Sequence, residues 1–211
     1  MDRLVHVVDD SEDVRRALLE LLALHDLAGR GHAGGDDFLA SVPSSARGCA
    51  VVDVRMPVMS GLELQQRMLE AGYTLPVVMV SAHGDVATAV RALKAGAMDF
   101  LQKPYGSDAI MAVIRKALDL DARRHAERLH SETILARLAL LTDRERQILT
   151  LVTEGLYNKV IADRLGLSVS TVEADRNRLM KKLRAQSLYE LVQIQALADA
   201  ASRRQGRIHP T

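Results

Sequence analysis

The chain has 211 residues, of which 48% are hydrophobic and 26% charged, and a net charge of +1 at pH 7. This length suits one or two compact domains, and the composition is that of a globular protein rather than a disordered chain. The single cysteine, Cys49, excludes a disulfide framework and a cysteine-based zinc site, and because no apolar stretch reaches the roughly 18 residues of a membrane span, we expect a cytoplasmic protein.

The first 120 residues alternate short apolar runs with helix-period segments. Strands are expected at Leu4–Val8, Cys49–Val52 and Pro76–Val80, with weaker ones near Leu27–His32 and Met98–Leu101. This alternation is typical of βαβ units, in which helices cover both faces of a parallel sheet.

The intervening helices carry plausible end signals. Ser11 is a candidate N-cap for the first and Asp85 for the fourth, which Gly96 is expected to close. From Ser107 to about Arg137 the sequence is helical throughout. Periodicity leaves open whether this is one long helix or a fifth helix followed by a linker helix.

From about Ala139 the pattern becomes purely helical. Two sites have the capping-box spacing, Thr142 with Glu145 and Ser187 with Glu190.

Between these sites, Gly155 ends the first helix of this part. A short helix at Lys159–Leu165 is followed by a turn through Gly166 and a longer helix at Val169–Leu183. Two helices joined by such a turn predict a helix-turn-helix. From Ala139 onward 12 basic residues stand against 8 acidic ones, whereas the preceding part has 16 against 19, and this basic excess permits nucleic-acid contact.

Polar residues follow several of the predicted strands. Asp9 and Asp10 follow the first, Asp53 ends the third, Ser81 ends the fourth and Lys103 follows the fifth. The carboxyl ends of parallel strands meet at one edge, where ligands bind. Gathered carboxylates favour a cation, and oxygen ligands suit Mg²⁺. Capping, turn or surface roles explain each residue singly, but their shared position favours phosphoryl transfer to Asp53.

Four segments resemble the receiver domain of two-component response regulators: VVDD at 7–10, DVRMPVMSG at 53–61, VSAHGD at 80–85 and DFLQKP at 99–104. The resemblance implies a flavodoxin-like fold with strand order 2-1-3-4-5, and a sensor histidine kinase as phosphodonor.

The resemblance also implies residue roles. Asp53 would be the phosphoacceptor, with Asp10 and Asp53 as direct Mg²⁺ ligands, Asp9 as an outer ligand and the backbone carbonyl of Arg55 completing the set. Lys103 would pair with the phosphoryl group.

The same resemblance implies a cis bond between Lys103 and Pro104, which proline makes accessible. It also implies a switch in which Ser81 moves toward the phosphoryl oxygen and Phe100 turns inward. A permanently buried Phe100 ring is the competing interpretation.

The segment from Leu141 to Leu183 resembles the LuxR-type helix-turn-helix domain, an all-α, four-helix fold. With the receiver it is typical of the NarL/FixJ family, and the HGD wording at 83–85 favours the FixJ branch. Two departures stand out. Asp175 replaces a usual histidine, and a carboxylate there would repel phosphate; Val160 replaces a usually polar residue.

On the helix Val169–Leu183, we expect a packed stripe of Val172, Leu179 and Leu183. The expected outward set is Ser170, Glu173, Ala174, Asn177 and Lys181. Candidate base contacts are Asn177 with adenine, Arg176 with guanine and Glu173 with cytosine. Candidate phosphate contacts are Lys159, Thr171, Arg178, Lys181 and Lys182. A merely solvated charged face is the alternative interpretation.

The predicted organisation is a receiver at 1–120, a helical linker at 121–138, the DNA-binding domain at 139–203 and a flexible tail at 204–211. We expect a phosphorylation-switched transcription factor, in which phosphorylation of Asp53 favours receiver dimers and binding to paired half-sites of double-stranded promoter DNA. The helix Leu188–Ala198 is the expected dimer surface of the DNA-binding domain. RNA polymerase is a further candidate partner. Beyond slow self-dephosphorylation we expect no enzymatic activity.

Three other functions are alternatives to this expectation. A phosphorylation-independent pseudo-receiver would retain DNA binding but lack the intact acidic cluster. An aspartate-nucleophile phosphatase needs a second carboxylate two residues after the nucleophile, where this chain has Arg55. A hydrolase triad of Ser81, His83 and Asp85 lacks the G-x-S-x-G turn around its serine.

Overall fold

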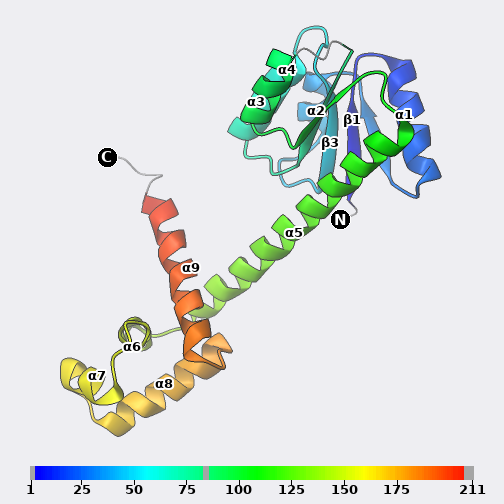
Figure 1. The fold of residues 1–211 in the computed structure, drawn as a ribbon. Coiled ribbons are helices and arrows are strands. Elements are labelled where there is room, and N and C mark those ends of the chain that lie inside the picture. The colour runs from blue at the N-terminus through cyan, green and yellow to red at the C-terminus, as the bar shows by residue number, and fades with distance from the viewer. Residues whose placement is uncertain (1–2, 83–85, 207–211) are drawn as a thin grey trace. The chain divides into compact units, whose positions relative to one another are not determined.

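The computed structural model describes residues 3–82 and 86–206 (Figure 1). The chain divides into two compact units, residues 1–125 and 126–211. The division falls within α5 (Ser107–Ala139), so the segment that periodicity left ambiguous is one helix. Among the described residues, no helix is both long and apolar enough to cross a membrane.

The first unit contains a five-stranded parallel sheet in the order β2-β1-β3-β4-β5, as predicted. Its strands are β1 (Leu4–Val8), β2 (Gly29–His32), β3 (Gly48–Asp53), β4 (Val77–Ser81) and β5 (Asp99–Gln102). Every residue of β3 and β4 is buried, which is why both strands were conspicuous as continuous apolar runs.

Helices cover both faces of this sheet (Figure 1). They are α1 (Glu12–Leu24), α2 (Gly35–Ser41), α3 (Gly61–Glu70), α4 (Val86–Lys94) and the first part of α5. Side chains of α1 and α5 form one core with alternate strand residues, and side chains of α2, α3 and α4 form the other.

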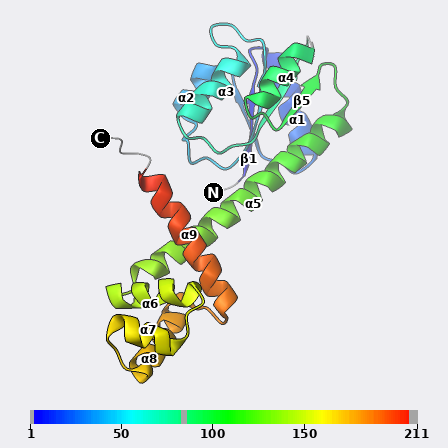
Figure 2. The same cartoon turned by 60° about the vertical axis from the view of Figure 1, so that its left-hand side comes forward.

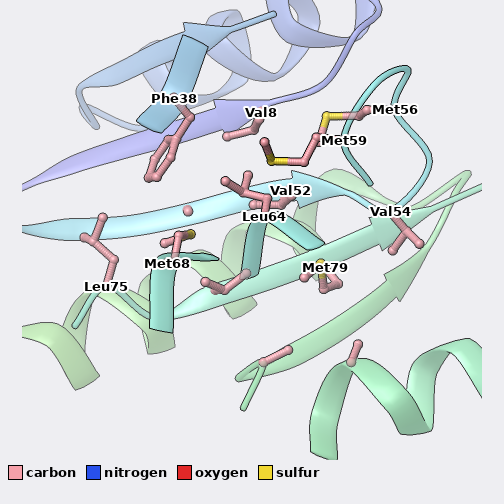
Figure 3. Close-up of a cluster of buried hydrophobic side chains, with 14 of the residues drawn as sticks. Val8, Phe38, Val52, Val54, Met56, Met59, Leu64, Met68, Leu75 and Met79 are labelled. Carbon is pink, nitrogen blue, oxygen red and sulfur yellow. The ribbon is translucent and has the colours of Figure 1, made fainter. Parts of the chain in front are cut away.

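The second of these cores is rich in methionine (Figure 3). Phe38, Leu64 and Met79 are fully buried there, and Met59 and Met68 fill the remaining space. Burying each such side chain stabilises the fold by about 1.5–3 kcal/mol. This packing holds the helices against the sheet and so fixes the loops that follow the strands.

The predicted helix ends are largely confirmed. The Ser11 hydroxyl accepts a hydrogen bond from Val14 N–H at the start of α1, and Gly96 has a φ of +96° just after α4. The predicted cap Asp85 lies outside the described residues.

In the second unit the described residues after α5 form further helices (Figure 2). They are α6 (Asp143–Thr153), α7 (Asn158–Leu165), α8 (Val169–Leu183) and α9 (Leu188–Gly206). Because α9 continues to Gly206, the first residues of the predicted flexible tail are helical.

The two capping boxes differ. Thr142 and Glu145 form the full reciprocal pair. At the start of α9, Ser187 accepts from Glu190 N–H, but the Glu190 carboxylate accepts from Gln186 N–H, one residue earlier than the motif requires.

A single core holds the second unit together. It includes Ile148 of α6, Ile161 of α7, Leu179 of α8 and Leu191 of α9. Leu138 joins it from the end of α5, so the last turn of the predicted linker packs as part of this unit.

Candidate functional site

Two buried carboxylates and a lysine meet at the carboxyl edge of the sheet. Asp9 follows β1 and Asp53 ends the neighbouring β3. The Lys103 Nζ lies 2.6 Å from Asp9 Oδ2 and 2.6 Å from Asp53 Oδ1. The predicted convergence of these three residues is therefore present.

The other oxygen of each carboxylate accepts a backbone hydrogen bond. Ser11 N–H donates to Asp9 Oδ1 over 2.9 Å, and Arg55 N–H donates to Asp53 Oδ2 over 2.6 Å. Both carboxylates are thus held in fixed orientations, with one oxygen of each directed at the shared ammonium group.

Lys103 remains a cation in this setting. Burial lowers its pKa, but the hydrogen bonds from its ammonium group to Asp53 and Asp9 outweigh that effect, and the net pKa is raised. Two carboxylates still share one positive charge, so the edge keeps a negative excess that favours a further cation.

Asp10 does not join this cluster. Its side chain is exposed, and among residues 3–82 and 86–206 no group of three His, Cys, Asp or Glu could hold a metal ion. The expected gathering of three carboxylates is therefore absent among the described residues in this conformation: β1 ends at Val8 and the chain bends at Asp10, so Asp10 is exposed while Asp9 is buried. Two carboxylates still fit Mg²⁺, which takes one or two from a protein and completes its ligands with water or phosphate.

Gly61, the last residue of the segment 53–61, determines how closely α3 approaches Asp53. Gly61 N–H donates to Val54 O over 3.0 Å, and a Cβ at Gly61 would lie 2.3 Å from the Asp53 carbonyl oxygen. Only glycine fits there. The sequence signal for this role was the position of Gly61 directly after Ser60, the N-cap of α3.

The remaining residues of this edge lie on β4 and β5. Ser81 is buried, and its carbonyl accepts from Lys103 N–H. Phe100 is only partly buried against the methionine-rich core, so a fully buried ring does not describe it. The Lys103–Pro104 bond is cis, as expected. His83 and Asp85 lie outside the described residues.

In the second unit, α8 has the predicted two faces. Val172, Leu179 and Leu183 are buried. The expected outward set is exposed in full: Ser170, Glu173, Ala174, Asn177 and Lys181. Lys159 and Val160 on α7 are exposed as well.

Two basic residues of α8 lie away from this outward face. Arg176 is half-buried, and its guanidinium donates to Asn158 Oδ1 of α7 over 3.1 Å. At about 100° per residue it falls on the packed side of the helix, which does not support the predicted guanine contact. Lys182 forms an ion pair with Glu145 of α6 over 2.6 Å, so its expected phosphate contact competes with that pair.

Asp175 also differs from expectation. Its side chain is buried and forms ion pairs with Arg144 and Arg178. The carboxylate is therefore paired and does not face solvent, and its effect on phosphate contacts stays a prediction.

Comparison with known families matches both units. The model for the response regulator receiver domain matches residues 5–115. The model for bacterial regulatory proteins of the luxR family matches residues 139–195.

Individual relatives match over nearly the whole chain. The transcriptional regulatory protein FixJ of Azorhizobium caulinodans is 44% identical over 93% of this chain and 93% of its own length. FixJ of Rhizobium meliloti is 40% identical over 92% and 95%.

Two solved structures are similar as well. The response regulator StyR has a TM-score of 0.83 at 38% identity, covering 92% of this chain and 98% of its own. Full-length FixJ from B. japonicum has a TM-score of 0.58 at 36% identity, covering 94% and 98%.

Proposed function

The chain belongs to the NarL/FixJ family of response regulators, with a receiver domain and a LuxR-type DNA-binding domain, and from this premise we propose that phosphoryl transfer to Asp53 controls its binding to promoter DNA. The observation that carries the proposal is the Lys103 ammonium group bridging Asp9 and Asp53 at 2.6 Å each.

Asp53 is the nucleophile of the proposed transfer. One of its carboxylate oxygens forms a bond to phosphorus as the phosphorus–nitrogen bond to the kinase imidazole breaks, leaving an acyl phosphate on Asp53. Lys103 lies within hydrogen-bond distance of Asp53 Oδ1 and pairs with the new phosphoryl oxygens. The Arg55 N–H, which donates to Oδ2, holds the carboxylate in position.

Mg²⁺ is the proposed cofactor. Asp10, Asp53 and the Arg55 carbonyl would hold it, with Asp9 as an outer ligand, and it would neutralise charge on the transferring oxygens. The negative excess around Lys103 supports this assignment.

The response to phosphorylation follows from the neighbouring strands. Ser81 ends β4 and its carbonyl accepts from Lys103 N–H, so a phosphoryl group that attracts both residues shifts the ends of β4 and β5. Phe100 on β5 is only partly buried, and its ring is proposed to turn inward. We propose that this change favours pairing with a second copy.

In the second unit, α8 is the proposed recognition helix. Asn177 and Glu173 are proposed to contact bases. The proposed backbone and groove contacts are Lys159, Ser170, Thr171, Ala174, Arg178 and Lys181. The exposed apolar residues Leu188, Tyr189 and Val192 make α9 the proposed pairing surface for two half-sites.

Intact-protein mass spectrometry tests the phosphoacceptor. The wild-type chain, treated with a small-molecule acyl phosphate and Mg²⁺, should gain one phosphoryl group, and Asp53→Asn should gain none. Asp13→Asn is the matched control, because Asp13 is exposed on α1 and pairs with the exposed Arg16. Equal labelling of Asp53→Asn and wild type would remove the proposed role.

Duplex-DNA affinity measured on the same samples separates the alternatives. We expect phosphorylated wild type to bind more tightly than Asp53→Asn. An unlabelled protein that binds DNA equally well in all samples would be a pseudo-receiver. Multiple turnover of added phosphate esters would instead indicate a phosphatase, which Arg55 argues against.

A further inference from the structure

The buried carboxylate of Asp175 lies beside the exposed face of α8. Its side chain is 1% exposed, whereas the side chains of Arg144 and Arg178, which contact it, are 51% and 57% exposed. A buried ionised carboxylate persists only when it is paired. Both arginines therefore neutralise Asp175 while keeping part of each side chain at the surface.

The contacts join two helices. Asp175 Oδ2 lies 2.8 Å from Arg144 Nε as an ion pair without hydrogen-bond geometry, and Oδ1 lies 3.5 Å from Nη2 of the same guanidinium. Oδ1 also accepts a hydrogen bond from Arg178, one turn along α8. Since Arg144 belongs to α6, one carboxylate fixes guanidinium groups from both helices.

The arginine pair continues the exposed face of α8. At about 100° per residue, Arg178 lies about 40° around the helix from Ala174 and about 60° from Lys181. Asp175 stands at the edge of that face, and beyond it Arg144 extends the basic surface onto the start of α6.

The cluster carries a net positive charge, since two guanidinium groups share one carboxylate. Each guanidinium has five N–H donors, and the two oxygens of Asp175 engage only some of them. The remaining donors form forks that match a phosphate group. A recognition helix in the major groove is flanked by phosphates of the DNA backbone. The arginine cluster lies beside α8, where such a phosphate would be.

We infer that Arg144 and Arg178 bind one DNA phosphodiester and that Asp175 is a positioning residue that holds both guanidinium groups at the surface. This inference rests on the DNA-binding role of the second unit. Held side chains lose less conformational entropy on binding than free ones. Asp175 thus strengthens phosphate binding although its own charge opposes it.

The first test compares two arginines of α6. Binding of the full-length chain to a fluorescent duplex of mixed sequence is measured by anisotropy over a range of NaCl concentrations. Arg144→Ala should bind several-fold more weakly. The negative slope of log K, the association constant, against log salt should become shallower by about 0.9. Arg146→Ala is the matched control: Arg146 is exposed and lies about 200° around α6. Equal slopes for the two variants would overturn the phosphate site.

The second test uses the sign of the effect of Asp175→Asn. If charge alone mattered, removing a negative charge would tighten DNA binding. If Asp175 positions the two arginines, its loss should weaken DNA binding several-fold. Tighter binding by a variant with wild-type circular dichroism and melting would overturn the positioning role.

A conservative variant keeps the inference testable if Asp175→Asn does not fold. Arg144→Lys retains the charge but not the fork, so its affinity should lie between those of wild type and Arg144→Ala, and wild-type affinity would contradict the inference. Failure of the wild-type chain to bind any duplex, with or without phosphodonor, would overturn the DNA-binding function itself. Intact wild-type binding with an unaffected Arg144→Ala would overturn only the inference.

Discussion

The acidic edge of the first unit and the Asp175 cluster of the second have opposite ratios of charge. At the acidic edge two buried carboxylates, Asp9 and Asp53, share the Lys103 ammonium group. In the other cluster one buried carboxylate contacts both Arg144 and Arg178. Burial forces pairing in both places, and the charge left over is negative in the first and positive in the second. That remainder suits a metal cation at one site and a DNA phosphate at the other.

A third pair shows the balanced case. Glu145 and Lys182 form a one-to-one ion pair over 2.6 Å with the glutamate buried. No charge is left over, so this pair should contribute to stability and not to ligand binding. Predictions that alter these ratios can therefore test the comparison.

The largest effect is expected from Lys103→Met, which leaves Asp9 and Asp53 without their cation. The free energy of unfolding of the first unit should fall by about 3 kcal/mol, measured by urea titration with circular dichroism. Added Mg²⁺ should restore part of this loss. The exposed Lys116 provides the control, and Lys116→Met should stay within about 0.5 kcal/mol of wild type. If Mg²⁺ does not change the stability of the Lys103→Met protein, the proposed preference of this edge for a cation is contradicted.

An uncharged buried pair, His6 and His32, predicts a pH dependence. Their ring nitrogens Nδ1 and Nε2 lie 3.0 Å apart, and burial, with His32 and Arg30 nearby, lowers the pKa of His6 from 6.5 to about 4. Between pH 6.5 and pH 4, His6 is protonated in the unfolded chain but not in the folded chain. The free energy of unfolding is therefore unaffected by His6 above pH 6.5 and decreases as pH falls toward 4. At 1.36 kcal/mol per pKa unit, the decrease is about 3 kcal/mol.

Urea titrations at several pH values check this loss. His6→Leu should lose less stability than wild type between pH 7 and pH 4. The control variant His25→Gln changes an exposed histidine and should follow wild type. Parallel curves for all three proteins would show that His6 is not the source.

A smaller effect is expected from Glu145→Gln, which keeps the cap but removes the charge. Burial raises the pKa of Glu145, but hydrogen bonds from Lys182 and Thr142 outweigh that and lower it overall. The pair therefore stabilises the fold above the unfolded value of 4.5, and this contribution is lost as pH falls through the lower folded pKa. At pH 7 the variant should lose about 1–2 kcal/mol.

The second capping glutamate supplies the control for this variant. Glu190 accepts from Gln186 N–H but forms no ion pair within the described part of the chain, so Glu190→Gln should change stability by less. If Glu145→Gln alters the salt slope of DNA binding, the balanced pair is not the neutral case proposed here.

The smallest effect concerns backbone strain in the loop after Asp53. Val58 has a φ of +67° and is 94% exposed, a conformation that costs a β-branched residue about 1 kcal/mol or more. Val58→Gly should raise the melting temperature slightly. Val90→Gly, within α4, should lower it. Destabilisation by Val58→Gly would contradict the strain.

Local features of the fold were predictable from sequence because they depend on residues close together in the chain. The capping box of Thr142 and Glu145 and the cap at Ser11 are three-residue spacings. The strand order followed from the family resemblance, and the bounds of α8 followed from its apolar stripe and the Gly166 turn before it. These signals need no knowledge of what packs against them.

The site residues were predictable in type more than in environment. Asp9, Asp53 and Lys103 converge because strand ends of a parallel sheet share an edge. Asp10 was placed with them by the same argument and is exposed, since the chain turns away after Asp9. Arg176 was expected to contact guanine, yet it donates a hydrogen bond to Asn158 of the neighbouring α7.

The sequence by itself determined the two families, the order of elements and the position of Asp53 at the tip of a buried strand, because periodicity, spacing and motif are properties of neighbouring residues. Tertiary structure alone decided that Asp175 is buried and that Arg144 reaches it from another helix. Whether a charged side chain is exposed or paired depends on which residues, distant in the chain, fold against it, and no local pattern records that partner.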